Sequence, residues 1–171
     1  MARSVALLRA VNVGGRKVPM AALRALAEGL GWRDVSTYIA SGNLLFTSDD
    51  ADPGWRIEAA MAEAFGLAVP ALVLTGDALR AALAACPYPD AAGNRVFGLF
   101  CWSEPTLSVP VVARWRASAE EIEVRGRAVW FHAPDGIGRS ELGGRLDKAI
   151  LGTPMTARNL NTLRTLAERL D

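Results

Sequence analysis

The sequence has little of what metal sites, disulfides and membrane spans require. It contains two cysteines, Cys86 and Cys101, and one histidine, His132, and these three residues show no metal-ligand spacing. No apolar run approaches the roughly 20 residues of a transmembrane helix. The apolar run before Arg9 is also shorter than the hydrophobic region of a signal peptide. We therefore expect a cytoplasmic protein with no metal, no other cofactor and no membrane partner.

Net charge is also small, at +1 from 19 basic and 18 acidic residues. Proteins that bind nucleic acid usually carry a basic surface, because displaced counterions supply much of the affinity. The composition therefore disfavours a nucleic-acid partner. Nearly all the basic residues are arginines, whose planar guanidinium suits phosphate groups. A codon bias toward Arg, Ala and Gly is the simpler explanation of this excess.

Strand and helix patterns alternate along the first half of the chain. Apolar periodicity predicts strands at 4–11, 35–40, 44–48 and 68–75, and helices at 20–31 and 55–66. The pair Gly42-Asn43 is typical of a two-residue hairpin turn, which would place Ile39 opposite Phe46. The order is βαββαβ, and a linking helix follows in "GDALRAALAAC".

The same order recurs in the second half. The predicted elements are a strand at 95–102, a helix at 106–116, a hairpin at 120–133, a helix at 139–152, a short strand near 154–157 and a final helix at 159–170. A βαββαβ unit is the ferredoxin-like arrangement. The sequence therefore predicts an α+β protein with antiparallel sheets, made of two ferredoxin-like units at 1–86 and 87–171 that pack into one compact body.

Polar loops at two sheet edges are the candidate sites. In the first unit, Asn12, Ser41 and Asn43 follow strands that end at the same edge. In the second unit, the loop "PDGIGRS" and the end of the last strand share an edge, with one strand between them. There, Ser140 would cap the helix at 139–152, whose N-terminus favours an anion beside Arg139. A tight turn with a helix cap is the alternative interpretation, since the Gly-x-Gly-x-x-Gly pattern is incomplete.

Catalytic constellations are scarce. Ser41 enters a hairpin, whereas a nucleophile elbow joins a strand to a helix. His132 lies on an apolar strand, and the acidic pairs lie in expected loops or at expected strand starts. No catalytic residue is therefore assigned.

Four motifs together resemble the bacterial domain-of-unknown-function family 1697: "LLRAVNVGGRKVPMAALR", "TYIASGNLLF", "PDGIGRSEL" and "TARNLNTL". The resemblance runs from about Val5 to Leu166 and implies two ferredoxin-like halves and no established reaction. Family signature positions fall on Arg9, Asn12, Gly14, Gly15, Ser41, Gly42, Asn43, Gly136, Gly138, Arg139, Ser140, Arg158, Asn159 and Asn161. The chain departs from the family at Ala10, Ala40 and Leu160, where glycine, glutamine and tryptophan are usual.

The leading hypothesis is a cytoplasmic protein that binds a phosphate-bearing or other anionic small molecule with Gly/Arg-rich loops. Its predicted ligand-binding residues are Arg139, Ser140, Arg158, Asn159, Gly136 and Gly138, with Arg9, Asn12, Ser41 and Asn43. One alternative is a protein-interaction or self-association module. Another is an enzyme acting on nucleotides or nucleic acid, for which the sequence offers no acidic metal cluster. The sequence leaves open the oligomeric state and whether the two edges form one site.

Overall fold

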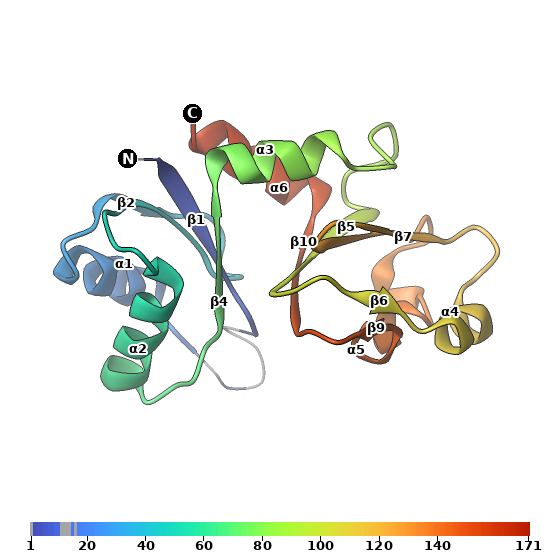
Figure 1. The fold of residues 1–171 in the computed structure, drawn as a ribbon, viewed down its shortest axis with the longest axis horizontal. Helices are drawn as coiled ribbons and strands as arrows, with labels where there is room; N and C mark the ends of the chain where they lie inside the picture. Colours follow the sequence, from blue (N-terminus) through green and yellow to red (C-terminus); the bar gives the residue numbers. More distant parts are fainter. Residues whose placement is uncertain (1, 11–14, 16) are drawn as a thin grey trace. The chain divides into compact units, whose positions relative to one another are not determined.

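The computed structural model describes residues 2–10, 15 and 17–171, and it is an α+β structure of antiparallel sheets and helices (Figure 1). The chain divides into two compact units. Unit 1 comprises Met1–Arg80 and Leu166–Asp171, and unit 2 comprises Ala81–Thr165. The predicted α+β class is confirmed, whereas the division at residue 86 stays a prediction.

Unit 1 is built on a four-stranded antiparallel sheet in the order β2-β3-β1-β4. Local signals start and end helix α2 (Pro53–Phe65): the Asp52 carboxylate accepts the Trp55 N–H (3.0 Å) at its start, and Gly66 ends it with φ 66°. The elements are β1 (Arg3–Leu8), α1 (Met20–Gly29), β2 (Arg33–Thr37), β3 (Asn43–Thr47), α2 (Pro53–Phe65), β4 (Ala71–Thr75) and α3 (Gly76–Ala84), which continues into unit 2.

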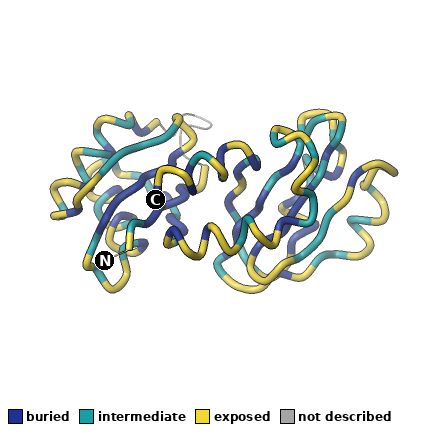
Figure 2. Tube along the Cα trace, turned by 90° about the horizontal axis from the view of Figure 1, so that it is seen from above, coloured by how far each residue is buried: buried dark blue, intermediate teal, exposed yellow. Residues whose placement is uncertain are grey.

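Two helices cover one face of this sheet. Leu23 of α1 and Ile57 of α2 are fully buried against Ala6 and Phe46 of the sheet. Trp32 stacks on Phe46 with ring centroids 4.0 Å apart, and its indole N–H donates to the Asp50 carboxylate (2.6 Å). Buried residues run along the strands while exposed residues dominate the outer loops (Figure 2). This face is therefore the main hydrophobic core of unit 1.

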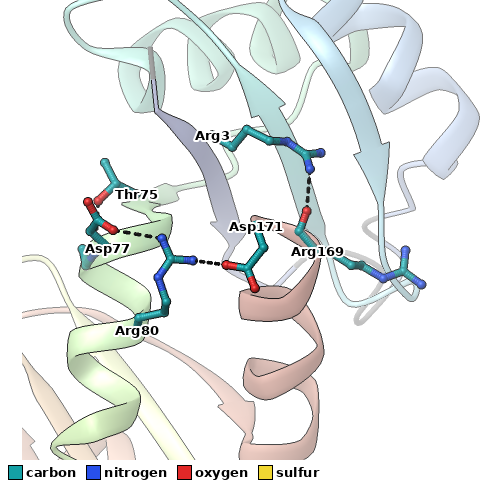
Figure 3. A network of polar contacts seen from close by, with 7 residues as sticks. Arg3, Thr75, Asp77, Arg80, Arg169 and Asp171 are labelled. Carbon is teal, nitrogen blue, oxygen red and sulfur yellow. Dashed lines mark hydrogen bonds and ion pairs between the residues drawn. The ribbon is translucent and has the colours of Figure 1, made fainter.

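The last turn of the chain is fixed to unit 1 by polar contacts (Figure 3). Arg3 donates to the carbonyl of Arg169 (2.5 Å) at the end of α6 (Leu160–Arg169). Arg80 pairs with both Asp171 (2.7 Å) and Asp77 (2.9 Å). These ion pairs are largely exposed, so we expect each to contribute only about 0–1 kcal/mol.

The hairpin between β2 and β3 differs from its prediction. β2 ends at Thr37 and β3 begins at Asn43, so residues 38–42 form the connection and Gly42-Asn43 is not a two-residue turn. Phe46 lies opposite Ser4 of β1, and Leu45 lies opposite Ser36 of β2. Asn43 is the first residue of β3, and its backbone carbonyl accepts the Tyr38 N–H (3.1 Å).

Unit 2 repeats the strand order of unit 1. Its four-stranded antiparallel sheet has the order β10-β5-β8-β7, in which the first strand again lies between the third and the fourth. A small two-stranded sheet, β6-β9, is added. The elements are β5 (Val96–Cys101), β6 (Thr106–Leu107), α4 (Val109–Trp115), β7 (Glu121–Arg125), β8 (Ala128–His132), α5 (Leu146–Ala149), β9 (Ile150–Leu151) and β10 (Met155–Asn159).

The two faces of the second sheet have different neighbours. Phe97, Leu99 and Phe131 pack with Leu142 and Leu146 from the segment that follows β8. The opposite face carries Gly98 and Trp130, which lie side by side in the sheet. A Cβ atom at Gly98 would lie 2.9 Å from Leu163 of α6 and 3.1 Å from the Trp130 ring. Glycine at position 98 therefore leaves the space that these two side chains fill.

The predicted helix at 139–152 is wrong. Two 310 turns, Ile137–Arg139 and Gly143–Arg145, lead into the four-residue helix α5, which passes directly into β9. The pair Gly143-Gly144 lowers helix propensity in the middle of the segment. A Cβ at Gly143 would also lie only 2.9 Å from the carbonyl oxygen of Ile137, so the chain turns too tightly there for a continuous helix. The argument for an anion at this helix N-terminus is lost with the helix.

Candidate functional site

One sheet edge in unit 2 brings together the segments that the sequence predicted. Asn159 at the end of β10 lies opposite Phe97 of β5, and Phe97 lies opposite Phe131 near the end of β8. The loop after β8, residues 133–140, therefore leaves the sheet at the edge where β10 ends, with β5 between them. We call this segment the 133–140 loop.

Gly136 and Arg95 determine the shape of the 133–140 loop. Gly136 has φ 98° and ψ 143°, a conformation that only glycine adopts readily, and its N–H donates to the Ala133 carbonyl (2.9 Å). Any Cβ at this position would overlap Nη1 of Arg95. The Arg95 guanidinium therefore lies directly on the loop backbone. Gly138 has open space around it and no unusual φ, so its geometry does not require glycine.

Arg95 is the residue that sequence reasoning missed. It precedes β5, and its carbonyl accepts the Ala133 N–H (2.9 Å), which places it beside the start of the loop. Within the described part of the chain, neither Arg95 nor Arg139 forms an ion pair. Asp135 is the one acidic residue of the 133–140 loop, and it is exposed. This edge therefore carries the two guanidinium groups of Arg95 and Arg139, with Asp135 in the loop and Glu121 opposite His132 on the neighbouring strand.

Ser140 and Asn159 both have structural roles at this edge. The Ser140 hydroxyl accepts the Gly143 N–H (2.8 Å) and so holds the turn after the loop. Its hydroxyl hydrogen remains available to donate. The Asn159 side chain accepts the Thr162 N–H (2.8 Å) and caps the start of α6. The side chain of Asn161 packs where a Cβ of Gly93 would stand.

Arg158 lies on the other face of the sheet. It is opposite Gly98, in the same row as Trp130, whereas the segment after Arg139 packs against the Phe97 and Phe131 face. Its guanidinium is buried and donates to the Thr156 hydroxyl (2.9 Å) and the Ala157 carbonyl (2.7 Å). Burial lowers the pKa of Arg158 to about 10, which leaves it protonated at neutral pH. The sheet thus separates Arg158 from the 133–140 loop.

The edge in unit 1 has a hydrogen-bonded hairpin loop. The Asn43 amide is fully buried and donates to the Tyr38 carbonyl (2.9 Å) and the Ser41 hydroxyl (3.1 Å). The exposed Arg9 follows β1 and donates its N–H to the Pro70 carbonyl (2.9 Å). Asn12 lies outside the described residues. Asn43 therefore stabilises the loop, and the exposed Arg9 and Ser41 are the predicted ligand residues that solvent reaches here.

Two residues at this edge have left-handed backbone conformations. Ala10 has φ 56° and Ile39 has φ 50°. A positive φ is unusual for a β-branched residue, because its Cβ crowds the backbone. The position of Ala10 is one where the family resemblance implies glycine, which adopts this conformation without that cost.

Replacing Ile39 with glycine is expected to leave the free energy of unfolding nearly unchanged, because relief of the left-handed strain, about 1–2 kcal/mol, offsets the entropy that glycine adds to the unfolded chain. The side chain is 50% exposed, so only half of its apolar area is lost. Urea denaturation measures the change. Ala40→Gly is the matched control: its φ is negative, so glycine there is expected to destabilise slightly. Equal losses in the two variants would contradict the strain argument.

Two partly buried groups of unit 2, the Tyr88 phenol and the Cys101 thiol, remain protonated at neutral pH. Burial, followed by the charges of Glu121 and Glu123, raises the pKa of Tyr88 to about 12. Burial raises the pKa of the Cys101 thiol to about 11. Neither group is therefore poised as a nucleophile or base. Among the described residues, no three His, Cys, Asp or Glu side chains gather as metal ligands, and no helix is long and apolar enough to cross a membrane.

Comparison with known proteins supports the assignment made from the motifs. The solved structure of the conserved bacterial protein SP0830 from Streptococcus pneumoniae is similar, with a TM-score of 0.74, 26% sequence identity and 99% of each chain covered. No curated protein matches the chain. The model of the family described as "Protein of unknown function (DUF1697)" matches residues 1–130, and the predicted membership is confirmed. The chain therefore belongs to the DUF1697 family of proteins of unknown function.

Proposed function

We propose that this protein binds a small phosphate-bearing or other anionic molecule in the cytoplasm, at the 133–140 loop together with Arg95. The observation that carries the proposal is the Arg95 guanidinium lying on the backbone of Gly136, where a Cβ at position 136 would force the guanidinium to move. Arg139 extends from the same loop and is exposed. Two guanidinium groups without an ion pair among the described residues suit a phosphate or carboxylate.

The role of each residue follows from its position. Arg95 and Arg139 would donate charge-assisted hydrogen bonds to the anion, and Ser140 would donate its hydroxyl hydrogen. Gly136 allows the close approach of Arg95 to the loop backbone. Arg158 lies beyond the sheet from this loop, so it has no part in the proposed site.

Titration calorimetry with inorganic phosphate, ADP and citrate tests the proposal. Arg95→Ala and Arg139→Ala are each expected to weaken binding by at least about tenfold, because a hydrogen bond to a charged group contributes about 1.5–3 kcal/mol. Arg95→Lys retains the charge but loses the planar fork, so we expect intermediate binding. Arg127→Ala is the control, since Arg127 is an exposed arginine that precedes β8, at the opposite end of that strand from the loop.

Two outcomes would end this proposal. One is the absence of binding heat for all three anions with the unmodified protein at millimolar concentration. The other is equal weakening by Arg127→Ala and the two loop variants, which would indicate non-specific attraction to positive charge.

We also infer that the chain is a duplication of the ferredoxin-like βαββαβ unit. The support is the identical position of the first, second, third and fourth strands in the two main sheets. Unit 1 has α1 and α2 on one sheet face, whereas unit 2 has α4 and the short α5 with its 310 turns. The second unit would therefore have lost a regular second helix, at the segment that carries the proposed anion site.

A further inference from the structure

A groove of about 290 Å³ lies beside α2 in unit 1. Its wall on the helix consists of Trp55, Glu58, Ala59 and Ala62, and residues 68–70 form the other wall before β4 begins. The four helix residues are spaced at i, i+3, i+4 and i+7, so they share one helix face. The two alanines leave room between the larger side chains and the connection to β4. The groove is thus an open, largely apolar depression.

Trp55 is unusually exposed for its size, at 66%. An indole face attracts cations through its quadrupole, and tryptophan is the strongest of the aromatic side chains in this respect. The other tryptophan of unit 1, Trp32, is only 4% exposed because it stacks on Phe46. Trp55, unlike Trp32, therefore leaves most of its surface accessible to a ligand.

Glu58 supplies the one charged side chain of the groove. Its Oε1 accepts the Ala71 N–H (2.7 Å), which fixes the carboxylate between the helix and the sheet edge. None of the described lysines and arginines lines the groove, and the neighbouring Arg56 pairs instead with Asp50 (3.4 Å). An exposed indole and an oriented carboxylate therefore stand on the same helix face, with apolar walls around them.

We propose that this groove binds a small quaternary ammonium cation. Its cationic head lies over the Trp55 ring and beside the Glu58 carboxylate, and its alkyl groups pack on the alanines and Pro70. The volume is close to the lower limit of small-molecule sites. Among the described residues of unit 1, the other exposed large apolar residue is Ile39, and it does not line the groove, which favours a small molecule over a protein surface. This site is separate from the proposed anion site in unit 2.

Choline is the test probe, and its neutral isostere 3,3-dimethylbutan-1-ol is the matched control ligand. The full chain is titrated with each while the indole N–H signal of Trp55 is followed by NMR, assigned by its loss in Trp55→Phe. We expect saturation with choline in the millimolar range, and at least about tenfold weaker binding of the neutral alcohol. Equal binding of the two ligands, or a Trp55 signal that does not respond to choline, would overturn the proposal.

A variant pair tests the carboxylate. Glu58→Gln keeps an oxygen acceptor for the Ala71 N–H and removes the charge, so choline binding is expected to fall by about fivefold or more. Glu63→Gln changes an exposed glutamate of α2 that does not line the groove, and binding is expected to be unchanged. Unchanged choline binding in Glu58→Gln would overturn the proposal that the Glu58 carboxylate binds the cation. The comparison of choline with the neutral alcohol uses the unmodified protein, so it tests the proposal even if Glu58→Gln does not fold.

Discussion

Replacing Phe46 with alanine is expected to lower the free energy of unfolding of unit 1 by about 3–5 kcal/mol. Phe46 is 1% exposed and stacks on Trp32 with ring centroids 4.0 Å apart. It lies in the central pair of strands, where helices α1 and α2 cover the sheet. Truncation removes buried apolar area, leaves a cavity between rigid elements and exposes one face of Trp32. A stacked aromatic pair also contributes about 0.5–1.5 kcal/mol beyond its buried area.

Urea denaturation followed by circular dichroism measures this loss, with the two units fitted as separate transitions where the curve requires it. Trp55→Ala is the control, because it removes an aromatic side chain of the same unit that is 66% exposed. We expect that variant to change the free energy of unfolding by no more than about 0.5 kcal/mol. Comparable losses in the two variants would contradict the assignment of the core to the face covered by α1 and α2.

The order of strands and helices was predictable because local signals and periodicity agree along most of the chain. Asp52, Pro53 and Gly66 mark the start and end of α2, and each has the role that its residue type predicts. The α+β class follows from the same features, whereas the family was predicted from the resemblance of four sequence motifs. The sharing of an edge by the 133–140 loop and the end of β10 was also predictable, since strand direction alone determines it.

Register and close approach were not predictable from periodicity. The β2-β3 connection is five residues long, and the Asn43 side chain donates to Tyr38 and Ser41 within it, which no alternation of apolar residues signals. The segment at 139–152 has apolar residues at helical spacing, yet packing of Gly143 on the Ile137 carbonyl breaks the helix. A one-residue step along β10 sends Asn159 and Arg158 to opposite faces. Arg95 stood outside every motif, and only its contact with Gly136 identifies it.

The glycines show most clearly which features local sequence predicts and which depend on non-local packing. Gly66 and Gly126 have positive φ and sit where a helix ends or a hairpin turns, so their roles could be deduced from the sequence. Gly98 has no such signal, because it stands in the middle of an apolar strand. Its role depends on side chains from β8 and α6 that are more than thirty residues away in the chain. Non-local packing of this kind can be tested by mutation.

Replacing Gly98 with alanine is expected to destabilise unit 2 by about 1–3 kcal/mol through overpacking. The added methyl would lie 2.9 Å from Cδ1 of Leu163 and 3.1 Å from the Trp130 ring, and both side chains are fully buried. Gly144→Ala is the control: it has no close neighbour and a negative φ, so a change within about 0.5 kcal/mol is expected.

A double-mutant cycle with Leu163→Ala distinguishes overpacking at position 98 from an unfavourable strand propensity of alanine in β5. Leu163→Ala alone is expected to cost about 2–5 kcal/mol because it leaves a cavity over the sheet. In the double variant the new methyl at position 98 enters that cavity, so the combined loss is expected to fall short of the sum by at least about 0.5 kcal/mol. Chemical denaturation of all four proteins gives the coupling free energy. Additive losses would mean that a Cβ at residue 98 and the Leu163 side chain do not occupy the same space. That result would contradict the packing of Leu163 on Gly98.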